Sequence, residues 1–306
     1  MALGFETQTL ETPDGVSLAV FSHTPPAWDA ARHPTLFLSN GLGGNLVTWK
    51  HLVEHHRQTH RIITWDYRGL YDSTFSPALK DRYRKGEIDV DLPAHARDAM
   101  VVLDRLGVDR AVFFGWSMGV QLNFELARTE QARMAGLVQI CGAAGKAIAT
   151  TVFGKAGLAM IPAAMDGFKF AASRFGPTLA RVMGSPLALQ LAKGLGVVAP
   201  SLDTELAQEV VGSYMSQDFE VYNRILMSLA AHDASDVLPG LHVPTLVIAG
   251  TRDPMTPMAL SQQIVAALPD GELVTLEGGS HYVPVEFPDR LNELVGRFLS
   301  ERVRPA

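Results

Sequence analysis

The sequence predicts an α/β protein with a mostly parallel central sheet, helices on both faces of the sheet and an inserted helical segment. Short apolar runs that end in glycine or polar residues alternate with helical stretches along most of the chain. This alternation is the pattern of βαβ units, whose parallel strands are buried on both faces. It stops between residues 142 and 233 and then resumes, which predicts one insertion into a single α/β core.

The chain begins with a predicted hairpin. Residues 5–11 and 16–22 alternate between polar and apolar side chains well enough for half-buried strands. Thr12, Pro13, Asp14 and Gly15 between them are typical turn residues.

The elements of the parallel part follow from the apolar runs and the helical patterns between them. Before the insertion we expect strands at 34–41, 61–66, 111–115 and 137–141, separated by helices at 45–56, 93–107 and 121–129. After it we expect strands at 243–250 and 272–276 and helices at 258–269 and 288–302.

The inserted segment is rich in alanine, glycine and methionine and contains no clear buried strand. Its pattern is that of several short helices, broken at 184–186 and near Ala199 and Pro200. We therefore expect a core formed by residues 1–141 and 234–306, and a helical cap formed by residues 142–233.

The composition excludes several classes of function. Of 306 residues, 47% are hydrophobic and 19% are charged, and the net charge of −6 comes without a basic cluster, which argues against nucleic-acid binding. A single cysteine, Cys141, excludes an intramolecular disulfide and fits a reducing compartment. The first residues lack the pattern of a signal peptide, and no window is apolar enough to span a membrane. We expect a cytoplasmic protein with no integral membrane segment.

The stretch Gly115-Trp116-Ser117-Met118-Gly119 has the pattern G-x-S-x-G between an expected strand and an expected helix. The pattern alone should occur by chance in roughly one in ten chains of this size. A sharp strand-to-helix turn, however, needs small neighbours and projects its serine beside a helix N-terminus, where negative charge is favoured. The context therefore predicts that Ser117 is a nucleophile, although Val120 is larger than the residue that often follows such turns.

A serine nucleophile needs a general base and an acid that orients the base. Ligands of open parallel sheets bind at the carboxyl ends of the strands, and two suitable residues follow late strands. Asp253 comes after the strand at 243–250, and His281 comes after the strand at 272–276. We expect them to act as acid and base.

Two other carboxylates compete with Asp253 for the role of the acid. Asp233 and Asp236 lie where the insertion rejoins the core, from which an acid can also be supplied. We favour Asp253 and expect Asp236 to cap or anchor the segment that leads into the strand at 243–250.

A tetrahedral intermediate also needs backbone N–H donors, each worth about 2.7–4 kcal/mol. One should be Met118, directly after the serine, and the other Leu42 in the glycine-rich loop 40–44. That loop lacks the spacing of a phosphate-binding loop. The scattered histidines and single cysteine form no ligand set, so we expect neither a metal nor an organic cofactor.

With these residues assembled, nearly the whole chain resembles the α/β-hydrolase superfamily, in its serine-nucleophile branch with a helical cap. The resemblance is carried by the motifs NGLGG, WDYRGLYDS, GWSMG, GTRDPMTP and GGSHYVP. It implies a triad of Ser117, Asp253 and His281, with the cap lying over Ser117 and selecting the substrate. Two positions depart from the family: many relatives have histidine in place of Asn40, and many have glycine in place of Tyr71.

The resemblance and the motifs together predict a serine hydrolase that cleaves a carboxylic ester, or a related acyl substrate, through an acyl-enzyme. The same triad also serves enol-lactonases, C–C bond hydrolases and acyltransferases, and a hydrolase-fold ligand receptor is a non-catalytic alternative. A serine at this turn argues against dehalogenases and epoxide hydrolases, which use aspartate there.

The substrate is expected to be a small ester-like molecule with an apolar group, because the cap sequence is apolar and has few charges. Methionines can line an adaptable pocket, although packing within the cap is the simpler role for each of them. The candidates are Met160, Met165, Met183, Met215 and Met227. The sequence leaves the oligomeric state open.

Overall fold

A computed structural model of the chain describes residues 4–146 and 181–303, together with residues 167, 174, 175, 178 and 179. Its centre is an eight-stranded sheet in the order β1-β2-β4-β3-β5-β6-β7-β8. The strands are β1 (Glu6–Glu11), β2 (Ser17–His23), β3 (Thr35–Ser39), β4 (Ile62–Trp65), β5 (Ala111–Trp116), β6 (Met134–Ile140), β7 (Thr245–Gly250) and β8 (Gly271–Leu276). The β1–β2 hairpin is antiparallel, and β2 also pairs antiparallel with β4. The pairs from β4 through β8 are all parallel, so the predicted mostly parallel sheet is confirmed.

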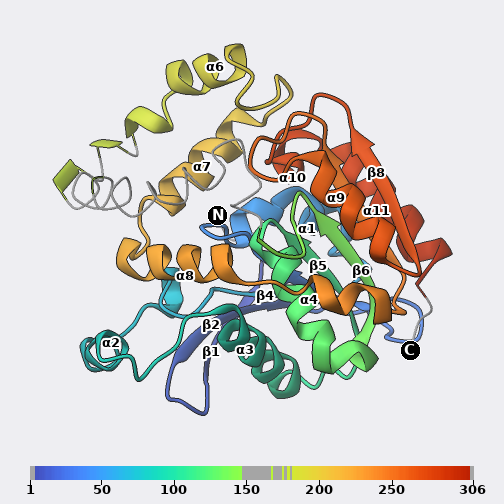
Figure 1. Ribbon diagram of the computed structural model, residues 1–306, viewed down its shortest axis with the longest axis horizontal. Coiled ribbons are helices and arrows are strands. Elements are labelled where there is room, and N and C mark those ends of the chain that lie inside the picture. The colour runs from blue at the N-terminus through green and yellow to red at the C-terminus, as the bar shows by residue number, and fades with distance from the viewer. Residues whose placement is uncertain (1–3, 147–166, 168–173, 176–177, 180, 304–306) are drawn as a thin grey trace.

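The helices pack on both faces of this sheet (Figure 1). One face, with Phe37 and Phe113, packs against α3 (Leu92–Arg105), α4 (Met118–Glu130) and α9 (Met258–Ala267). The other, with Leu38 and Phe114, packs against α1 (Lys50–His56) and α11 (Pro288–Glu301). Because neighbouring residues of a strand point to opposite faces, these continuous apolar strands supply both cores.

Most of the expected elements occur, with shifted ends and three additions. Asn45 caps the 3-10 turn η1 (Leu46–Trp49), which precedes α1 in the predicted helix 45–56. The strand expected at 137–141 begins earlier, at Met134. Three elements were not predicted: α2 (Pro77–Arg84), the 3-10 turn η2 (Tyr71–Ser73) and α10 (Val283–Glu286). The start of α2 carries a recognisable signal, since Ser76 caps it and proline occupies its first position.

The sheet is interrupted between β6 and β7, as expected. The described part of this insertion contains α6 (Pro186–Gly194), α7 (Thr204–Tyr214) and α8 (Phe219–Ala231), followed by the 3-10 turn η5 (Ser235–Gly240). The predicted breaks are visible, because Ser185 caps α6 and Ala199 lies between α6 and α7. The two ends of the insertion pair through an isolated bridge between Gly145 and Asp233.

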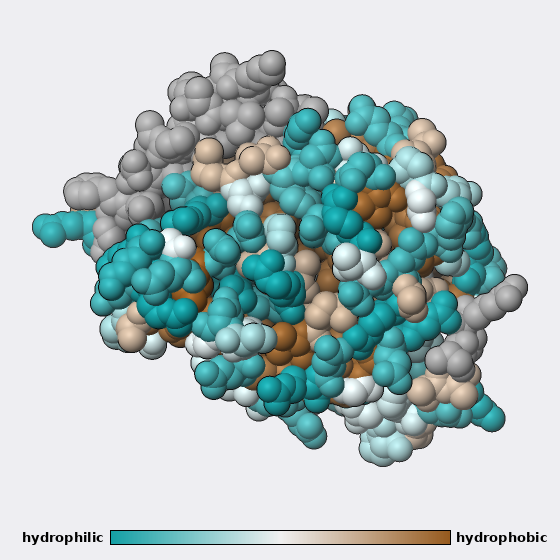
Figure 2. Space-filling view, turned by 60° about the horizontal axis from the view of Figure 1, so that its bottom comes forward, coloured by the Kyte–Doolittle hydropathy of each residue, from teal (hydrophilic) through white to brown (hydrophobic). Residues whose placement is uncertain are grey.

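Apolar residues lie mainly inside the core, as expected from the burial of apolar surface. On the face drawn in Figure 2, hydrophilic residues cover most of the described surface, with hydrophobic residues showing between them. Among the described residues, most of the large apolar side chains that stay exposed belong to the insertion. They are Phe175, Val182, Met183, Leu187, Leu191, Leu195, Val197 and Met227, with Met255 outside it.

A buried ion pair holds the segment that follows β4. Arg68 is 2% exposed, and its guanidinium donates to both carboxylate oxygens of Asp98 on α3, at 2.7 and 2.5 Å. It also donates to Asp14, in the hairpin turn, at 2.8 Å. This arginine therefore joins the hairpin, the loop after β4 and α3.

We predict that Asp98→Ala lowers the free energy of unfolding by about 3 kcal/mol, because it removes the bidentate partner of a buried guanidinium. Asp104→Ala, on the same helix, should cost less than about 1 kcal/mol, since Asp104 pairs with Arg133 at the surface. Urea unfolding followed by circular dichroism measures both values. Equal losses in the two variants would contradict the importance of the buried pair.

Candidate active site

The turn between β5 and α4 holds Ser117 in a backbone conformation that L-residues rarely adopt, with φ 55° and ψ −114°. The close approach of β3 explains the need for Gly119, because a Cβ there would lie 2.1 Å from the carbonyl oxygen of Ser39. Gly115 is equally confined, since its Cβ would lie 2.7 Å from the backbone of Gly119. The chain therefore turns sharply at Ser117, as the motif predicts.

Val120, the larger residue after the motif, is accommodated by a small residue opposite. Val120 is fully buried, and a Cβ on Gly142 would lie 2.3 Å from its Cγ2 atom. The absence of a side chain at Gly142 leaves the room that Val120 needs.

The structure brings Ser117, His281 and Asp253 together, although 164 residues separate the serine from the histidine. Nε2 of His281 lies 2.8 Å from Oγ of Ser117, and Nδ1 lies 2.8 Å from Oδ2 of Asp253. The loops after β7 and β8 lie side by side, because the N–H of Arg252 donates to the carbonyl of Gly279 at 2.8 Å. The histidine is 4% and the aspartate 6% exposed, so both side chains are shielded from water.

Asp253 is held in its charged form. Burial raises the pKa of Asp253, but hydrogen bonds from His281 and Thr256 outweigh it and keep that pKa below its ordinary value. Thr256 donates its hydroxyl to Oδ2 at 2.6 Å and its N–H to Oδ1 at 2.9 Å. Because an ionised carboxylate only accepts, His281 carries its proton on Nδ1 and presents an unprotonated Nε2 to Ser117.

The two rival carboxylates lie elsewhere. Asp236 forms an ion pair with Arg128, and its side chain is 67% exposed. Asp233 accepts hydrogen bonds from Ser235 and pairs with Lys146. Neither has a hydrogen bond to His281, so within the described residues only Asp253 has the position that an orienting acid needs.

The two expected oxyanion donors flank the serine. Met118 is the first residue of α4, so its N–H has no acceptor within the helix. No hydrogen bond from the N–H of Leu42 is present among the described residues. Leu42 lies in the loop after β3, the strand that pairs with β5.

Asn40, which stands where many relatives have histidine, braces that loop through both of its amide groups. Its Nδ2 donates to the carbonyl of Trp65 at 2.9 Å, and its Oδ1 accepts from Nε1 of Trp49 at 2.8 Å. Its own carbonyl accepts from the hydroxyl of Tyr67 at 2.6 Å. The departure from the family therefore still fixes the start of the loop.

The loop that carries His281 is fixed by residues that sequence analysis missed. Nε1 of Trp116, next to the serine, donates to the carbonyl of His281 at 2.8 Å. Glu286, 1% exposed, accepts from the N–H and hydroxyl of Ser280 at 2.8 and 2.6 Å, and from the N–H of Ala199 at 2.7 Å. The one signal for Glu286 is an acidic residue within the apolar stretch VPVEF. It ties the histidine loop to the insertion.

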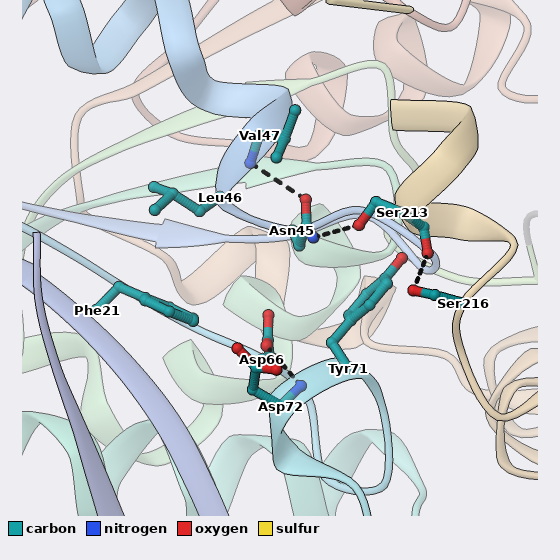
Figure 3. A pocket seen from close by; sticks show the side chains of 9 residues that line it. All are labelled: Phe21, Asn45, Leu46, Val47, Asp66, Tyr71, Asp72, Ser213 and Ser216. Carbon is teal, nitrogen blue, oxygen red and sulfur yellow. Dashed lines mark hydrogen bonds between the residues drawn. The ribbon is translucent and has the colours of Figure 1, made fainter. Parts of the chain in front are cut away.

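A pocket of about 410 Å³ lies beside the same edge of the sheet (Figure 3). It is lined by residues of the loop after β3, the segment after β4 and the end of α7, among them Asn45, Asp66, Tyr71 and Ser213. Burial raises the pKa of Asp66 to about 7, against the hydrogen bond that it accepts from the N–H of Asp72. The triad residues do not line this pocket, so we do not assign the reaction to it.

Two structural searches limit the kinds of site in the part of the chain that is described. It contains no group of three or more histidine, cysteine, aspartate or glutamate side chains placed to hold a metal ion. Within the same residues, every helix is too short or too polar to cross a bilayer.

Residues 34–288 match the family model described as the alpha/beta hydrolase fold. The chain belongs to the α/β-hydrolase family. This membership agrees with the predicted superfamily and with the observed sheet order and helix placement.

The relatives and structural neighbours of this α/β hydrolase support hydrolase chemistry. The chain is 27% identical, over 87% of its length and 91% of the relative's, to a protein of Azorhizobium caulinodans named "Putative carbamate hydrolase RutD". A hydrolase structure from Pseudomonas aeruginosa has a TM-score of 0.72 at 26% identity, covering 96% of this chain and 98% of that one. An esterase structure from Thermogutta terrifontis has a TM-score of 0.67 at 21% identity, covering 98% and 99%, and it shows the shared fold.

We predict that Gly119→Ala lowers the free energy of unfolding by about 3 kcal/mol, because the new methyl group meets the β3 backbone at 2.1 Å. Gly296→Ala in α11 should instead stabilise by up to about 1 kcal/mol, since that position is open and alanine favours the helix. Chemical unfolding of both variants gives the comparison. A neutral Gly119→Ala would show that the approach of β3 does not constrain the turn.

Proposed function

We propose that the chain is a serine hydrolase that cleaves a carboxylic ester, or a related acyl substrate, through an acyl-enzyme intermediate. The observation that carries the proposal is the continuous hydrogen-bonded array from Oγ of Ser117 through His281 to Asp253, with both contacts at 2.8 Å. Each group then has the neighbour that its role requires.

In the proposed mechanism, Ser117 attacks the substrate carbonyl while Nε2 of His281 accepts its proton. Asp253 stabilises the resulting imidazolium, and the N–H groups of Leu42 and Met118 hold the oxyanion. Collapse of the intermediate expels the alcohol, which takes the proton back from His281. Water then attacks the acyl-enzyme by the same steps, releasing the acid and restoring the serine.

Carbamates are a second candidate substrate class, and the names of the curated relatives favour them. A carbamate is attacked at its carbonyl in the same way as an ester, so the same residues serve both. Relatives with this name match 87% of the chain in Azorhizobium caulinodans and 91% in Pseudomonas syringae. The enol-lactonase, C–C hydrolase, acyltransferase and receptor alternatives gain no comparable support, and a receptor has no need of the array.

We further propose that residues 142–233 form a cap that helps to select the substrate. Its helices reach the oxyanion loop, because a Cβ on Gly43 would lie 2.7 Å from the ring of Tyr214 on α7. Its apolar side chains support an apolar acyl or alcohol group in the substrate. Met183 and Met227 are exposed and Met215 is partly buried, while Met160 and Met165 lie outside the described residues.

We predict that a fluorophosphonate probe labels the protein at Ser117, because an activated serine hydroxyl attacks phosphorus as it attacks a carbonyl. Ser117→Ala should abolish both labelling and the hydrolysis of nitrophenyl esters and carbamates. Peptide mapping locates the label, and kcat/KM for acyl groups of graded length ranks the substrates. Hydrolysis that survives Ser117→Ala would overturn the mechanism.

We predict that Asp253→Asn lowers kcat/KM about 10⁴-fold, because the amide favours the wrong tautomer of His281 and cannot stabilise its cation. Asp236→Asn is the matched control and should keep kcat/KM within about twofold of the wild type, since its partner is Arg128 at the surface. Steady-state kinetics on one nitrophenyl ester compares them. The reverse pattern would transfer the role of the acid to Asp236.

A further inference from the structure

Tyr71 adopts an uncommon backbone conformation for a bulky side chain. Its φ is 49°, in the left-handed region that favours glycine. It opens η2, directly after the segment that Arg68 anchors. A strained conformation of this kind persists only where surrounding contacts hold it, and it often accompanies a functional constraint.

The Tyr71 hydroxyl supplies one such contact. It donates to the carbonyl oxygen of Gly43 at 2.5 Å. Gly43 has a φ of +82° and directly follows Leu42, the proposed oxyanion donor. The hydrogen bond therefore joins the segment after β4 to the loop after β3, one residue from the N–H that is expected to hold the oxyanion.

The far end of this loop is also tied to the insertion. Nδ2 of Asn45 donates to Oγ of Ser213 on α7 at 2.6 Å, and the Tyr71 hydroxyl points toward the same serine (Figure 3). The rings of Tyr214 and Tyr222 cover Gly43, whose Cβ would lie 2.7 Å from the first and 3.2 Å from the second. The loop is thus enclosed by Tyr71 on the core side and by α7 and α8 on the insertion side.

The hydrogen bonds to the loop divide it into two parts. Asn40, at its start, is fixed by Trp49, Trp65 and Tyr67. From Gly41 to Gly44 the loop contains three glycines, which can occupy many backbone conformations. In this stretch the Tyr71 hydroxyl is the one side-chain hydrogen-bond donor among the described residues.

We propose that Tyr71 is a positioning residue: its hydrogen bond to the Gly43 carbonyl holds the glycine-rich loop so that the Leu42 N–H points into the oxyanion hole. The inference rests on the proposed serine-hydrolase function. An oxyanion donor acts where charge develops in the transition state, so its misplacement affects kcat more than ground-state binding.

The test is Tyr71→Phe, which keeps the ring and removes the hydroxyl. We expect kcat for a nitrophenyl ester to fall about five- to tenfold while KM stays within about twofold, as for one lost hydrogen bond that acts in the transition state. Binding of a boronic acid that forms a tetrahedral adduct with Ser117 should weaken by the same factor. Tyr83→Phe is the matched control, because it removes a hydroxyl that donates to the carbonyl of Glu220 on α8, and it should leave kcat unchanged.

A second variant separates positioning from stability. Tyr71→Gly relieves the left-handed φ, so it should fold as well as the wild type while losing at least as much kcat as Tyr71→Phe. The inference is overturned if Tyr71→Phe keeps wild-type kcat and boronic-acid affinity, even with a lowered melting temperature. It is also overturned if kcat and KM change equally in Tyr83→Phe.

The Ser117→Ala variant distinguishes failure of this inference from failure of the proposed function. If Ser117→Ala keeps hydrolysis, the proposed function fails and the role of Tyr71 fails with it. If Ser117→Ala abolishes hydrolysis while Tyr71→Phe retains wild-type kcat, the serine mechanism stands and only the role of Tyr71 is lost.

Discussion

The close contact between β3 and the first turn of α4 is the constraint on which the site depends. Gly119 lies so near the Ser39 carbonyl that no side chain fits between them. This contact allows the strand-to-helix turn at Ser117 to be sharp, and it places the loop after β3 beside the serine. The nucleophile and both proposed oxyanion donors therefore have their relative positions set by one backbone packing.

The insertion is attached to the site at both of its moving parts. Glu286 joins the histidine loop to Ala199, and Tyr71 and Asn45 enclose the oxyanion loop together with α7. In the proposed enzyme, a substrate group that contacts the insertion thus lies one or two hydrogen bonds away from the base and from the oxyanion donor. Substrate selection by a cap and the geometry of catalysis are in this way physically connected.

The two departures from the family follow one physical logic. Asn40 replaces a histidine, but its amide both donates and accepts, so it braces the loop in two directions. Tyr71 replaces a glycine and is held in a strained conformation, and its hydroxyl reaches the other part of the same loop. Both substitutions therefore add polar contacts to the loop that carries Leu42.

The sequence by itself determined the fold class and the order of most elements, because buried strands, helical periodicity and the glycines at Ser117 are local signals. It also marked Asp253 and His281, since both follow strands whose ends must meet at one edge of the sheet. Only the tertiary structure decided between Asp253 and Asp236 as the neighbour of His281, and only it showed the contacts of Glu286 and Tyr71. These contacts join residues far apart in the chain, and no local pattern records which loops pack together.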